Sequence, residues 1–333
     1  MKKIRILLMM CFYLFALSGC GTQQQTYSKT DFCFDTAVSV TIYDSAAQAE
    51  RVNALLDETL ALCNSYDDMF SRTKEGSDIY RINHAEGEWT TVSDETIQLI
   101  QSALEYCKMT NGQIDITIAP VKDLWDFSGN DDVEMPRLAT IAETLPLVDY
   151  SGIEIEGSKV RLSHPNAAID LGFIAKGYIA DHVRAFLLES GVESALINLG
   201  GNIAVIGEKP DGNEFTIGIQ EPFASAGSYV MTVGCSQSGA GSYSSVVTSG
   251  TYERSFTYND KLYHHILDTS TGQPADTDLA SVTILTDSSL HADALSTTCL
   301  LLGCEKGVAY IESLDDVDAI FITTDGKIVD TRE

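Results

Sequence analysis

The chain is 333 residues long and strongly acidic, with 48 Asp and Glu residues against 21 Lys and Arg residues and a formal net charge of −27. Such a charge excludes nucleic acid as a partner, because the phosphate backbone would be repelled. The length is sufficient for a sizeable hydrophobic core, in one large domain or two small ones.

The N-terminal residues have the pattern of an export signal. A basic segment at residues 2–5 precedes an apolar run at residues 6–17, which is too short to span a bilayer. Small residues then precede Cys20, as is typical of signals whose cysteine is lipidated. We therefore predict a signal peptide over residues 1–19 and an extracytoplasmic protein anchored to a membrane by lipid on Cys20. An ordinary secretory signal with an incidental cysteine is the alternative.

The remainder of the chain is predicted to be one folded domain behind a short linker. Residues 20–31 begin with a polar, Gln-rich stretch and are expected to form a lipidated tether. Residues 32–333 show no break in composition that would divide them. Cys63, Cys107 and Cys299 fall on the apolar faces of predicted helices, so we expect buried free thiols there.

The first half of the domain is predicted to contain a strand, three helices and a hairpin. Val38, Val40 and Ile42 alternate with polar residues and indicate a strand. Apolar residues at helical spacing indicate helices, and Ser93 is a suitable N-cap for the second of them. In chain order the predicted elements are a strand at 36–43, a helix around 52–63, a helix at 94–109, a hairpin at 153–162 and a helix at 174–190.

From residue 195 the sequence becomes rich in short strands. The predicted strands are 195–199, 215–219, 229–233, 255–258, 264–267 and 281–285, followed by helices at 292–302 and 306–313 and a terminal hairpin over 319–323 and 327–329. Helices and strands mix without a strict alternation, so the predicted fold class is α+β, as a single large mixed domain.

One group of polar residues lies at the start of the third predicted helix. Asp170 ends an apolar segment, where its carboxylate could hydrogen-bond a ligand or cap the helix. Free backbone N–H groups at a helix start attract phosphate, and Lys176 adds positive charge there. This stretch predicts an anion site, with a simple helix cap as the alternative.

A second group lies near the start of a later helix. Asp293 and Thr297 are four residues apart and hence on one helix face. Their oxygens suit a hard cation such as Mg²⁺, which commonly also binds substrate phosphates. In the alternative, structural interpretation, Asp293 caps the helix and Thr297 bonds the carbonyl four residues earlier.

A third group contains two adjacent histidines. His264 and His265 lie on a predicted strand and therefore point to opposite faces, so at most one faces a given pocket. With Asp268 three residues on, such a histidine could act as the base for a hydroxyl group. Histidines without a catalytic role are an equally open alternative.

Elsewhere, the Gly200-Gly201 pair after a strand permits a close backbone approach or a turn with positive φ.

In this order along the chain, the segments resemble the ApbE family, the FAD:protein FMN transferases. The resemblance runs from about residue 32 to the C-terminus, and many members of the family are lipoproteins. The matching motifs are Asp35-Thr36, Ser77 with Arg81-Ile82-Asn83, and the segments 112–117, 124–125, 170–177, 198–202, 209–212, 249–254, 265–268 and 293–297.

The resemblance implies a reaction and its participants. FAD binds with Mg²⁺, a Thr or Ser hydroxyl of a target protein attacks the pyrophosphate, and FMN is transferred with release of AMP. Phosphoryl transfer needs a cation, positive charge on the phosphates and a base for the incoming hydroxyl, and the groups described above supply each of these.

The resemblance also implies roles for individual positions. The metal ligands would be Asp293, Thr297 and the main-chain carbonyl of Phe173. His265 would be the base, with Asp268 as the residue that orients it. The flavin-nucleotide positions would be Phe34, Thr73, Gln113, Ile114, Asp115, Asp170, Lys176 and Ile266.

The chain departs from the family pattern at three positions. Asp35 stands where the family usually has glycine, Phe173 replaces a second glycine, and Thr269 stands where proline is common. Two other functions fit the same motifs: a FAD pyrophosphatase with water as acceptor, and a flavin-binding lipoprotein without turnover. Asp293 and Thr297 favour an enzyme, since flavin binding alone needs no cation.

Overall fold

The computed structural model describes residues 24–127, 134–225, 227–237 and 242–332. The predicted signal peptide and Cys20 lie outside these residues. Among the helices within them, none combines the length and the apolar character needed to cross a membrane.

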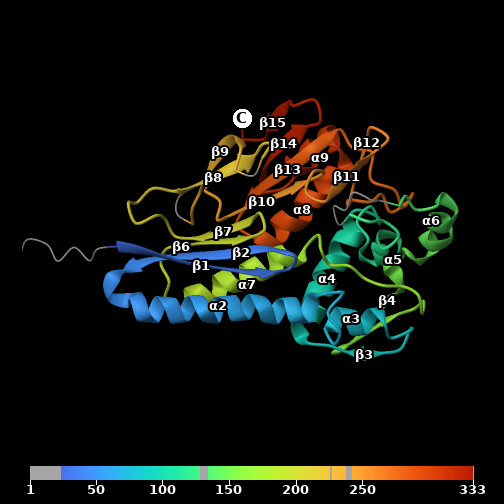
Figure 1. The fold of residues 1–333 in the computed structure, drawn as a ribbon, viewed down its shortest axis with the longest axis horizontal. Coiled ribbons are helices and arrows are strands. Elements are labelled where there is room, and N and C mark those ends of the chain that lie inside the picture. The colour runs from blue at the N-terminus through green and yellow to red at the C-terminus, as the bar shows by residue number, and fades with distance from the viewer. Residues whose placement is uncertain (1–23, 128–133, 226, 238–241, 333) are drawn as a thin grey trace, which may run out of the picture.

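The centre of the fold is an eight-stranded sheet in which all neighbouring strands are antiparallel. The strand order is β1-β2-β6-β7-β10-β13-β14-β15, which puts the N-terminal and C-terminal strands at opposite edges (Figure 1). The strands are β1 (Gln24–Cys33), β2 (Thr36–Ser45), β6 (Ala195–Leu199), β7 (Asn202–Ile206), β10 (Ser245–Gly250), β13 (Leu279–Thr286), β14 (Asp318–Thr323) and β15 (Ile328–Asp330).

Three helices pack on one face of this sheet. Helix α2 (Ala49–Phe70) contacts β1 and β2, α7 (Ala175–Glu189) contacts β6 and β7, and α8 (Ser289–Leu302) contacts β10 and β13. Helix α7 contacts both of the others. Their apolar faces and the facing strand residues form the main hydrophobic core, which fixes the starts of α7 and α8 side by side.

The opposite face of the sheet is covered by a hairpin, β8 (Phe215–Gln220) and β9 (Tyr229–Cys235). Its inward residues form a second core with residues of β7, β10, β13 and β14. Because both faces of the sheet are covered, every residue of β13 is buried, and its sequence is nearly continuous in apolar residues and Thr.

The remaining elements form a smaller region beside the sheet. It contains α3 (Asp78–Asn83), α4 (Asp94–Met109), α5 (Ala119–Lys122), α6 (Leu138–Thr144), a sheet ordered β3-β5-β4 (Thr90–Thr91, Lys159–Leu162, Ile153–Glu156) and the hairpin β11 (Ser255–Tyr258) with β12 (Lys261–His264). Helix α9 (Cys304–Ile311) packs on α8 and β14. A third apolar cluster around Trp125 and Phe256 joins α5 and α6 to the β11–β12 hairpin and so holds this region together.

Most predicted elements are present, and the α+β class is confirmed. Helix α4 has the predicted bounds, and the Ser93 side chain accepts a hydrogen bond from the Thr96 amide as its N-cap. Cys63, Cys107 and Cys299 are buried free thiols, as expected.

Two expectations about the chain path were wrong. The tether predicted over 20–31 is folded from Gln24 onward, because β1 pairs with β2 along its whole length. The strand predicted over 264–267 is displaced: β12 ends at His264, and Leu267 forms only an isolated bridge with Pro274.

Candidate active site

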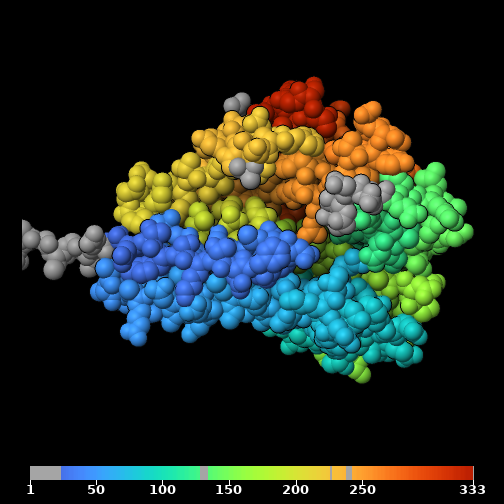
Figure 2. All heavy atoms as spheres, viewed as in Figure 1, coloured from blue at the N-terminus to red at the C-terminus, as the bar shows by residue number. Residues whose placement is uncertain are grey.

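A cleft of about 1330 Å³ opens where the large sheet meets the smaller region. In the space-filling view the surface is hollowed beside the tip of the β1–β2 hairpin (Figure 2). The cleft is lined by twelve of the residues to which the sequence assigned a role: Phe34, Thr73, Gln113, Ile114, Asp115, Asp170, Phe173, Lys176, His265, Ile266, Asp293 and Thr297.

Asp293 lies at the contact between α7 and α8. Its side chain is 2% exposed, its Oδ2 accepts a hydrogen bond from the Gly177 amide at 2.9 Å, and Lys176 Nζ lies 3.4 Å from Oδ1. The structural alternative for Asp293 was wrong, because the N-cap of α8 is Ser288. Asp293 is therefore a buried carboxylate at the cleft wall, compensated by one cation and one backbone donor.

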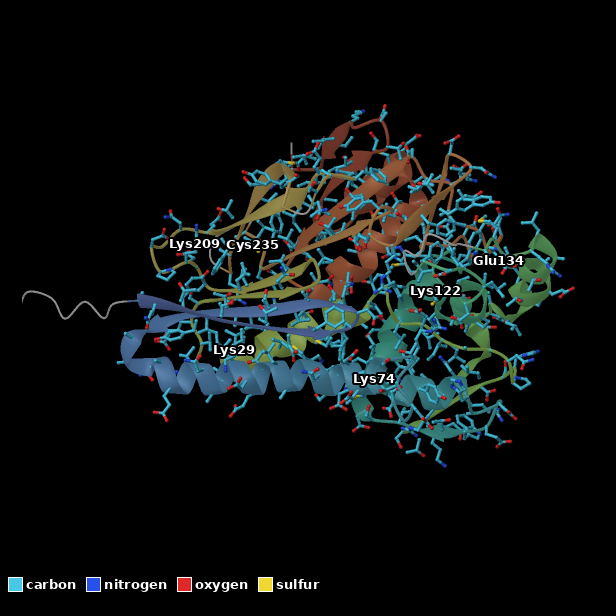
Figure 3. All side chains as sticks on the ribbon, in the orientation of Figure 1. Lys29, Lys74, Lys122, Glu134, Lys209 and Cys235 are labelled. Carbon is cyan, nitrogen blue, oxygen red and sulfur yellow. The ribbon has the colours of Figure 1, made fainter. Side chains whose placement is uncertain are left out.

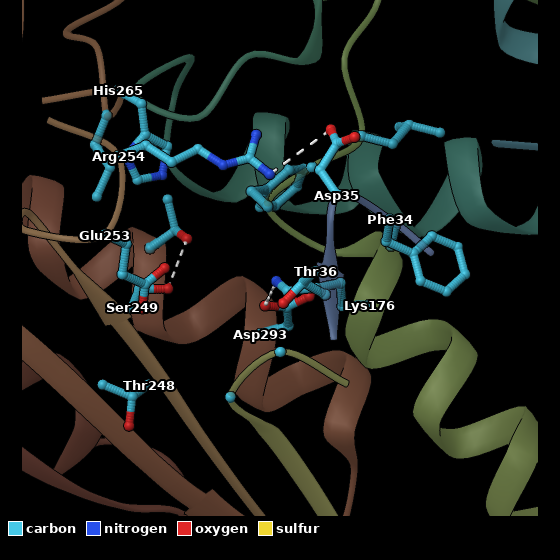
Figure 4. Close-up of a pocket in the computed structure, with 18 of the residues that line it drawn as sticks. Phe34, Asp35, Thr36, Lys176, Thr248, Ser249, Glu253, Arg254, His265 and Asp293 are labelled. Carbon is cyan, nitrogen blue, oxygen red and sulfur yellow. Dashed lines mark hydrogen bonds and ion pairs between the residues drawn. The ribbon is translucent and has the colours of Figure 1, made fainter. Parts of the chain in front are cut away.

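Thr297 follows one turn later on the same face of α8. Its hydroxyl lies 3.3 Å from that of Ser249 and does not bond the carbonyl of Asp293, which accepts from Ser296 instead. The structural alternative for Thr297 was therefore also wrong. Figure 4 labels Ser249 and Asp293 among the residues that line the cleft.

The donor set at this position fits a hard cation. Asp293 supplies a carboxylate and Thr297 a hydroxyl, and both line the cleft with Phe173, whose carbonyl was the third predicted ligand. The ring of Phe173 makes an edge-on contact with Tyr106, with the ring centroids 6.2 Å apart. The described residues contain no cluster of three His, Cys, Asp or Glu side chains suited to a metal, and the predicted ligand set includes only one such side chain.

The start of α7 differs from the predicted phosphate cradle. The amide of Gly177 is already engaged by the Asp293 carboxylate, so an acidic side chain takes the place expected for an external anion. Gly177 permits this contact, because an added Cβ would lie 2.2 Å from the backbone oxygen of Ser289. The anion site predicted at this helix start is thus partly filled by the protein itself.

Asp170 belongs to a charged network on the cleft wall. Its Oδ2 accepts from Lys122 Nζ at 2.7 Å, its Oδ1 accepts from the Gly172 amide at 2.7 Å, and Arg72 lies 3.9 Å away. Burial opposes ionisation of this carboxyl, but Lys122 and Arg72 outweigh it and hold its pKa below the usual range. Asp170 does not cap α7, whose N-cap is Ile174. Its carboxylate holds Lys122 and Arg72 in place.

His265 is the histidine that faces the cleft. Its neighbour His264 is buried beside β11, with Nε2 lying 3.2 Å from the carbonyl oxygen of Ala275, which confirms that only one of the pair reaches this site. Burial, followed by the charges of Lys122 and Arg254, lowers the pKa of His265 to about 3. The imidazole is therefore neutral at physiological pH, as a general base must be.

The orienting role expected for Asp268 has no support in this geometry. Its Oδ1 accepts hydrogen bonds from the amide and hydroxyl of Ser270, which closes a local turn. Within the described part of the chain, Nδ1 of His265 is buried without a hydrogen-bond partner. Asp268 also does not line the cleft.

Both carboxylate oxygens of Asp115 accept hydrogen bonds from nearby residues of the protein. One oxygen accepts from the amide and hydroxyl of Thr117, and the other accepts from the Tyr150 amide. Burial raises its pKa, although these hydrogen bonds oppose the shift. It shapes the cleft wall beside Gln113 and Ile114 and has little capacity left to bind a ligand.

Sequence reasoning gave no role to several charged residues of the cleft. Lys122 and Arg72 belong to none of the recognised motifs. Each forms an ion pair with Asp170, which is distant from it in the sequence. Glu253 and Arg254 stood within a matching motif and could have been singled out there. Partial desolvation by the cleft walls raises the pKa of Glu253 to about 7, with Lys176 opposing the shift and Asp293 adding to it. Figure 3 places Lys122 in the smaller region and Lys74 near the end of α2.

The comparisons with known proteins agree with this site. The profile of the ApbE family matches residues 34–321, which include every cleft residue with a predicted role. The chain belongs to the ApbE family. The ApbE resemblance drawn from the sequence and the expectation of an enzyme are thereby confirmed.

Curated ApbE relatives share most of their length with this chain. It is 38% identical over 281 residues to the FAD:protein FMN transferase of Klebsiella pneumoniae (strain 342), covering 83% of this chain and 84% of that protein. It is 31% identical over 342 residues to the FAD:protein FMN transferase of Treponema pallidum (strain Nichols), covering 97% and 92%.

Solved ApbE structures share the fold. The crystal structure of the ApbE protein from Thermotoga maritima superimposes with a TM-score of 0.81 at 31% identity, covering 92% of this chain and 97% of that one. The flavin transferase ApbE from Vibrio cholerae gives a TM-score of 0.79 at 25% identity, with the same coverage. The ApbE fold therefore includes both the large sheet and the smaller region that enclose the cleft.

Proposed function

We propose that this chain is an Mg²⁺-dependent FAD:protein FMN transferase, which moves FMN from FAD onto a Thr or Ser hydroxyl of a target protein and releases AMP. The observation that carries the proposal is the meeting of Asp293, Thr297 and His265 in one cleft. Asp293 does not cap α8, and its carbonyl accepts a hydrogen bond from Ser296 and not from Thr297. The names of the relatives support the choice of FAD and a protein acceptor.

The proposed reaction breaks the phosphoanhydride bond of FAD and forms a phosphoester bond to the acceptor. The acceptor oxygen forms a bond to the FMN phosphorus, the bond from that phosphorus to the oxygen of AMP breaks, and AMP leaves with the bonding electrons. When bound, Mg²⁺ supplies charge neutralisation for the diphosphate. Asp293, Thr297 and the carbonyl of Phe173 would hold it, while Lys176 compensates Asp293.

His265 is the residue that takes the proton of the incoming hydroxyl. Its imidazole is neutral because of burial and of Lys122 and Arg254 nearby. A bound diphosphate would offset both cations, which would raise the basicity of the imidazole at the moment when a proton must be accepted. Lys122 and Arg254 thus disfavour protonation of His265 in the free enzyme, and the bound substrate would cancel their effect.

We also propose that the chain is exported and held at a membrane by lipid on Cys20. The support is the sequence pattern of residues 1–20. FAD, the acceptor protein and the lipid bilayer would then be its three partners.

The decisive experiment incubates the protein with FAD, Mg²⁺ and a candidate acceptor and then weighs the acceptor by intact mass spectrometry. A mass increase equal to FMN, dependent on Mg²⁺, is the expected result. Release of FMN and AMP without modified acceptor would identify a FAD pyrophosphatase instead. Binding of FAD with neither product would identify a flavin carrier without turnover.

A further inference from the structure

Every Lys and Arg side chain that lines the cleft faces a carboxylate in the structure. The pairs are Arg72 with Asp123, Lys74 with Asp67 and Asp68, Lys122 with Asp170, Lys176 with Asp293, and Arg254 with Asp35. An incoming phosphate group must therefore compete with an internal carboxylate for whichever cation it contacts.

The Arg254–Asp35 pair is the one that is most easily separated. Its closest nitrogen and oxygen are 3.8 Å apart, with side-chain exposures of 48% and 87%. Lys122 and Asp170, by contrast, lie 2.7 Å apart with exposures of 23% and 9%. Long, exposed ion pairs contribute little to stability, so Arg254 is the cleft cation that an external anion releases at least cost.

Asp35 reaches this position from an unusual turn. Phe34 and Asp35 join β1 to β2 with φ values of 55° and 56°, a geometry that two-residue hairpins usually give to Asn-Gly. Two contacts fix the turn: the Phe34 amide donates to Asp67 at 3.2 Å, and Thr36 packs so closely against Gly200 that a Cβ on Gly200 would lie 2.4 Å from its Oγ1. Figure 4 shows the Asp35 carboxylate facing the Arg254 guanidinium, joined by a dashed line.

We propose that Asp35 is a built-in competitor for the substrate: it occupies Arg254 in the free cleft, and a phosphate group of the flavin dinucleotide displaces it. The inference deepens the proposed function and rests on it. Asp35 would then weaken nucleotide binding, and it would do so only for ligands that carry phosphate. Arg254 would be a binding residue and Asp35 a residue that sets affinity.

The test is the affinity of the Asp35→Asn variant for three ligands, measured by calorimetric titration at low salt. Asparagine has the same shape and tolerates a positive φ, so the turn is retained while the charge is removed. An exposed ion pair implies a tightening of roughly two- to fivefold for FAD and for inorganic pyrophosphate. Riboflavin, which has no phosphate, should bind as it does to the wild type.

A matched control removes an equivalent charge outside the cleft. Asp44 pairs with Arg51 at 3.7 Å, at the far end of the same hairpin, so Asp44→Asn changes the net charge equally and should leave all three affinities unchanged. Asp35→Gly is a second variant for the case in which the Asn side chain disturbs folding, since glycine has no Cβ cost at this φ.

The role of Arg254 is tested by a double-mutant cycle with Arg254→Gln. In that background Asp35→Asn should no longer tighten FAD or pyrophosphate binding. Three results would overturn the inference. The first is that Asp35→Asn binds FAD and pyrophosphate no more tightly than the wild type, the second is that it binds riboflavin more tightly by the same factor, and the third is that the tightening persists in the Arg254→Gln background. If the wild type binds pyrophosphate but not FAD, the proposed function fails, and the pyrophosphate cycle still decides whether Asp35 competes for Arg254.

Discussion

The backbone amide of Gly177 donates a hydrogen bond to Oδ2 of Asp293 at 2.9 Å, which ties the first turn of α7 to the second turn of α8. The contact uses a helix N-terminus to hold a carboxylate, in the favourable direction of the helix dipole. It also fixes one Asp293 oxygen and leaves the other, Oδ1, beside Lys176 at the cleft. The candidate cation site therefore depends on how closely these two helices approach.

Gly177→Ala should separate the helices and damage the site. The added Cβ would lie 2.2 Å from the Ser289 oxygen, and backbone atoms cannot move aside cheaply. We expect a loss of about 1–3 kcal/mol in the free energy of unfolding, as for other overpacked positions. Chemical denaturation measures this loss. A variant as stable as the wild type would show that the two helices are not held at this distance.

Asp293→Asn should abolish Mg²⁺-dependent transfer while keeping the fold. The asparagine oxygen can still accept from Gly177, but the negative charge that attracts the cation is lost. Initial rates of FMN transfer at rising Mg²⁺ should show only partial recovery. Thr297→Ser keeps a hydroxyl ligand and is the matched control, so it should retain most of the rate. Wild-type rates for Asp293→Asn would place the cation elsewhere.

His265→Ala should separate catalysis from binding. Loss of the base should slow FMN transfer by roughly 10²–10⁴-fold. FAD affinity should change little, because the charged groups of the cleft remain. Rate and affinity are measured on the same preparation, with a thermal melt as the folding control. A parallel loss of affinity would argue that His265 binds the nucleotide and is not the base.

The depressed pKa of His265 predicts a pH dependence of stability. In the folded protein the pKa of this imidazole is about 3, against about 6.5 in an unfolded chain. Between these values the unfolded state binds a proton that the native state does not, so stability falls as pH drops below about 6.5. His265→Asn removes this contribution. Calorimetry at pH 7 and pH 5 should show a smaller decrease in Tm for the variant, and an equal decrease would contradict the assigned cause.

Cys20→Ala should abolish lipid attachment. Because the predicted anchor depends on this thiol, the variant should be misprocessed or found in the soluble extracytoplasmic fraction. Carbonate extraction of membranes followed by immunoblotting distinguishes the outcomes. Unchanged, carbonate-resistant retention of the variant would show that something other than Cys20 holds the protein.

The predictable parts of the fold are those whose elements are defined by residues close together in the sequence. Helix α4 was placed to the residue because Ser93 caps it and Asn111-Gly112, both at positive φ, terminate it. Strand β1 was missed because it is an edge strand with only Tyr27 and Cys33 buried, so its composition resembles that of a linker. Its pairing with β2 is visible only in three dimensions.

The residues of the candidate site also fall into a predictable group and an unpredictable group. The ordered motifs located Asp293, Thr297 and His265, because each is a chemically distinctive residue in a short pattern. The partners that set their electrostatics could not be found, since Lys122 lies 48 positions before Asp170 and far from His265 in sequence. Long-range ion pairs leave no periodic trace in a sequence.

With the proposed lipid on Cys20, strand β1 would limit how far from a bilayer the chemistry takes place. Only three residues separate Cys20 from Gln24, where β1 begins, and an extended chain spans at most roughly 3.6 Å per residue, so a lipid anchor would hold the sheet within about 14 Å of its attachment point. The ten residues of β1 then lead over roughly 33 Å to the turn at the cleft. Acceptors that share the membrane surface would meet the cleft at a high effective concentration, while freely diffusing proteins would meet it at their bulk concentration.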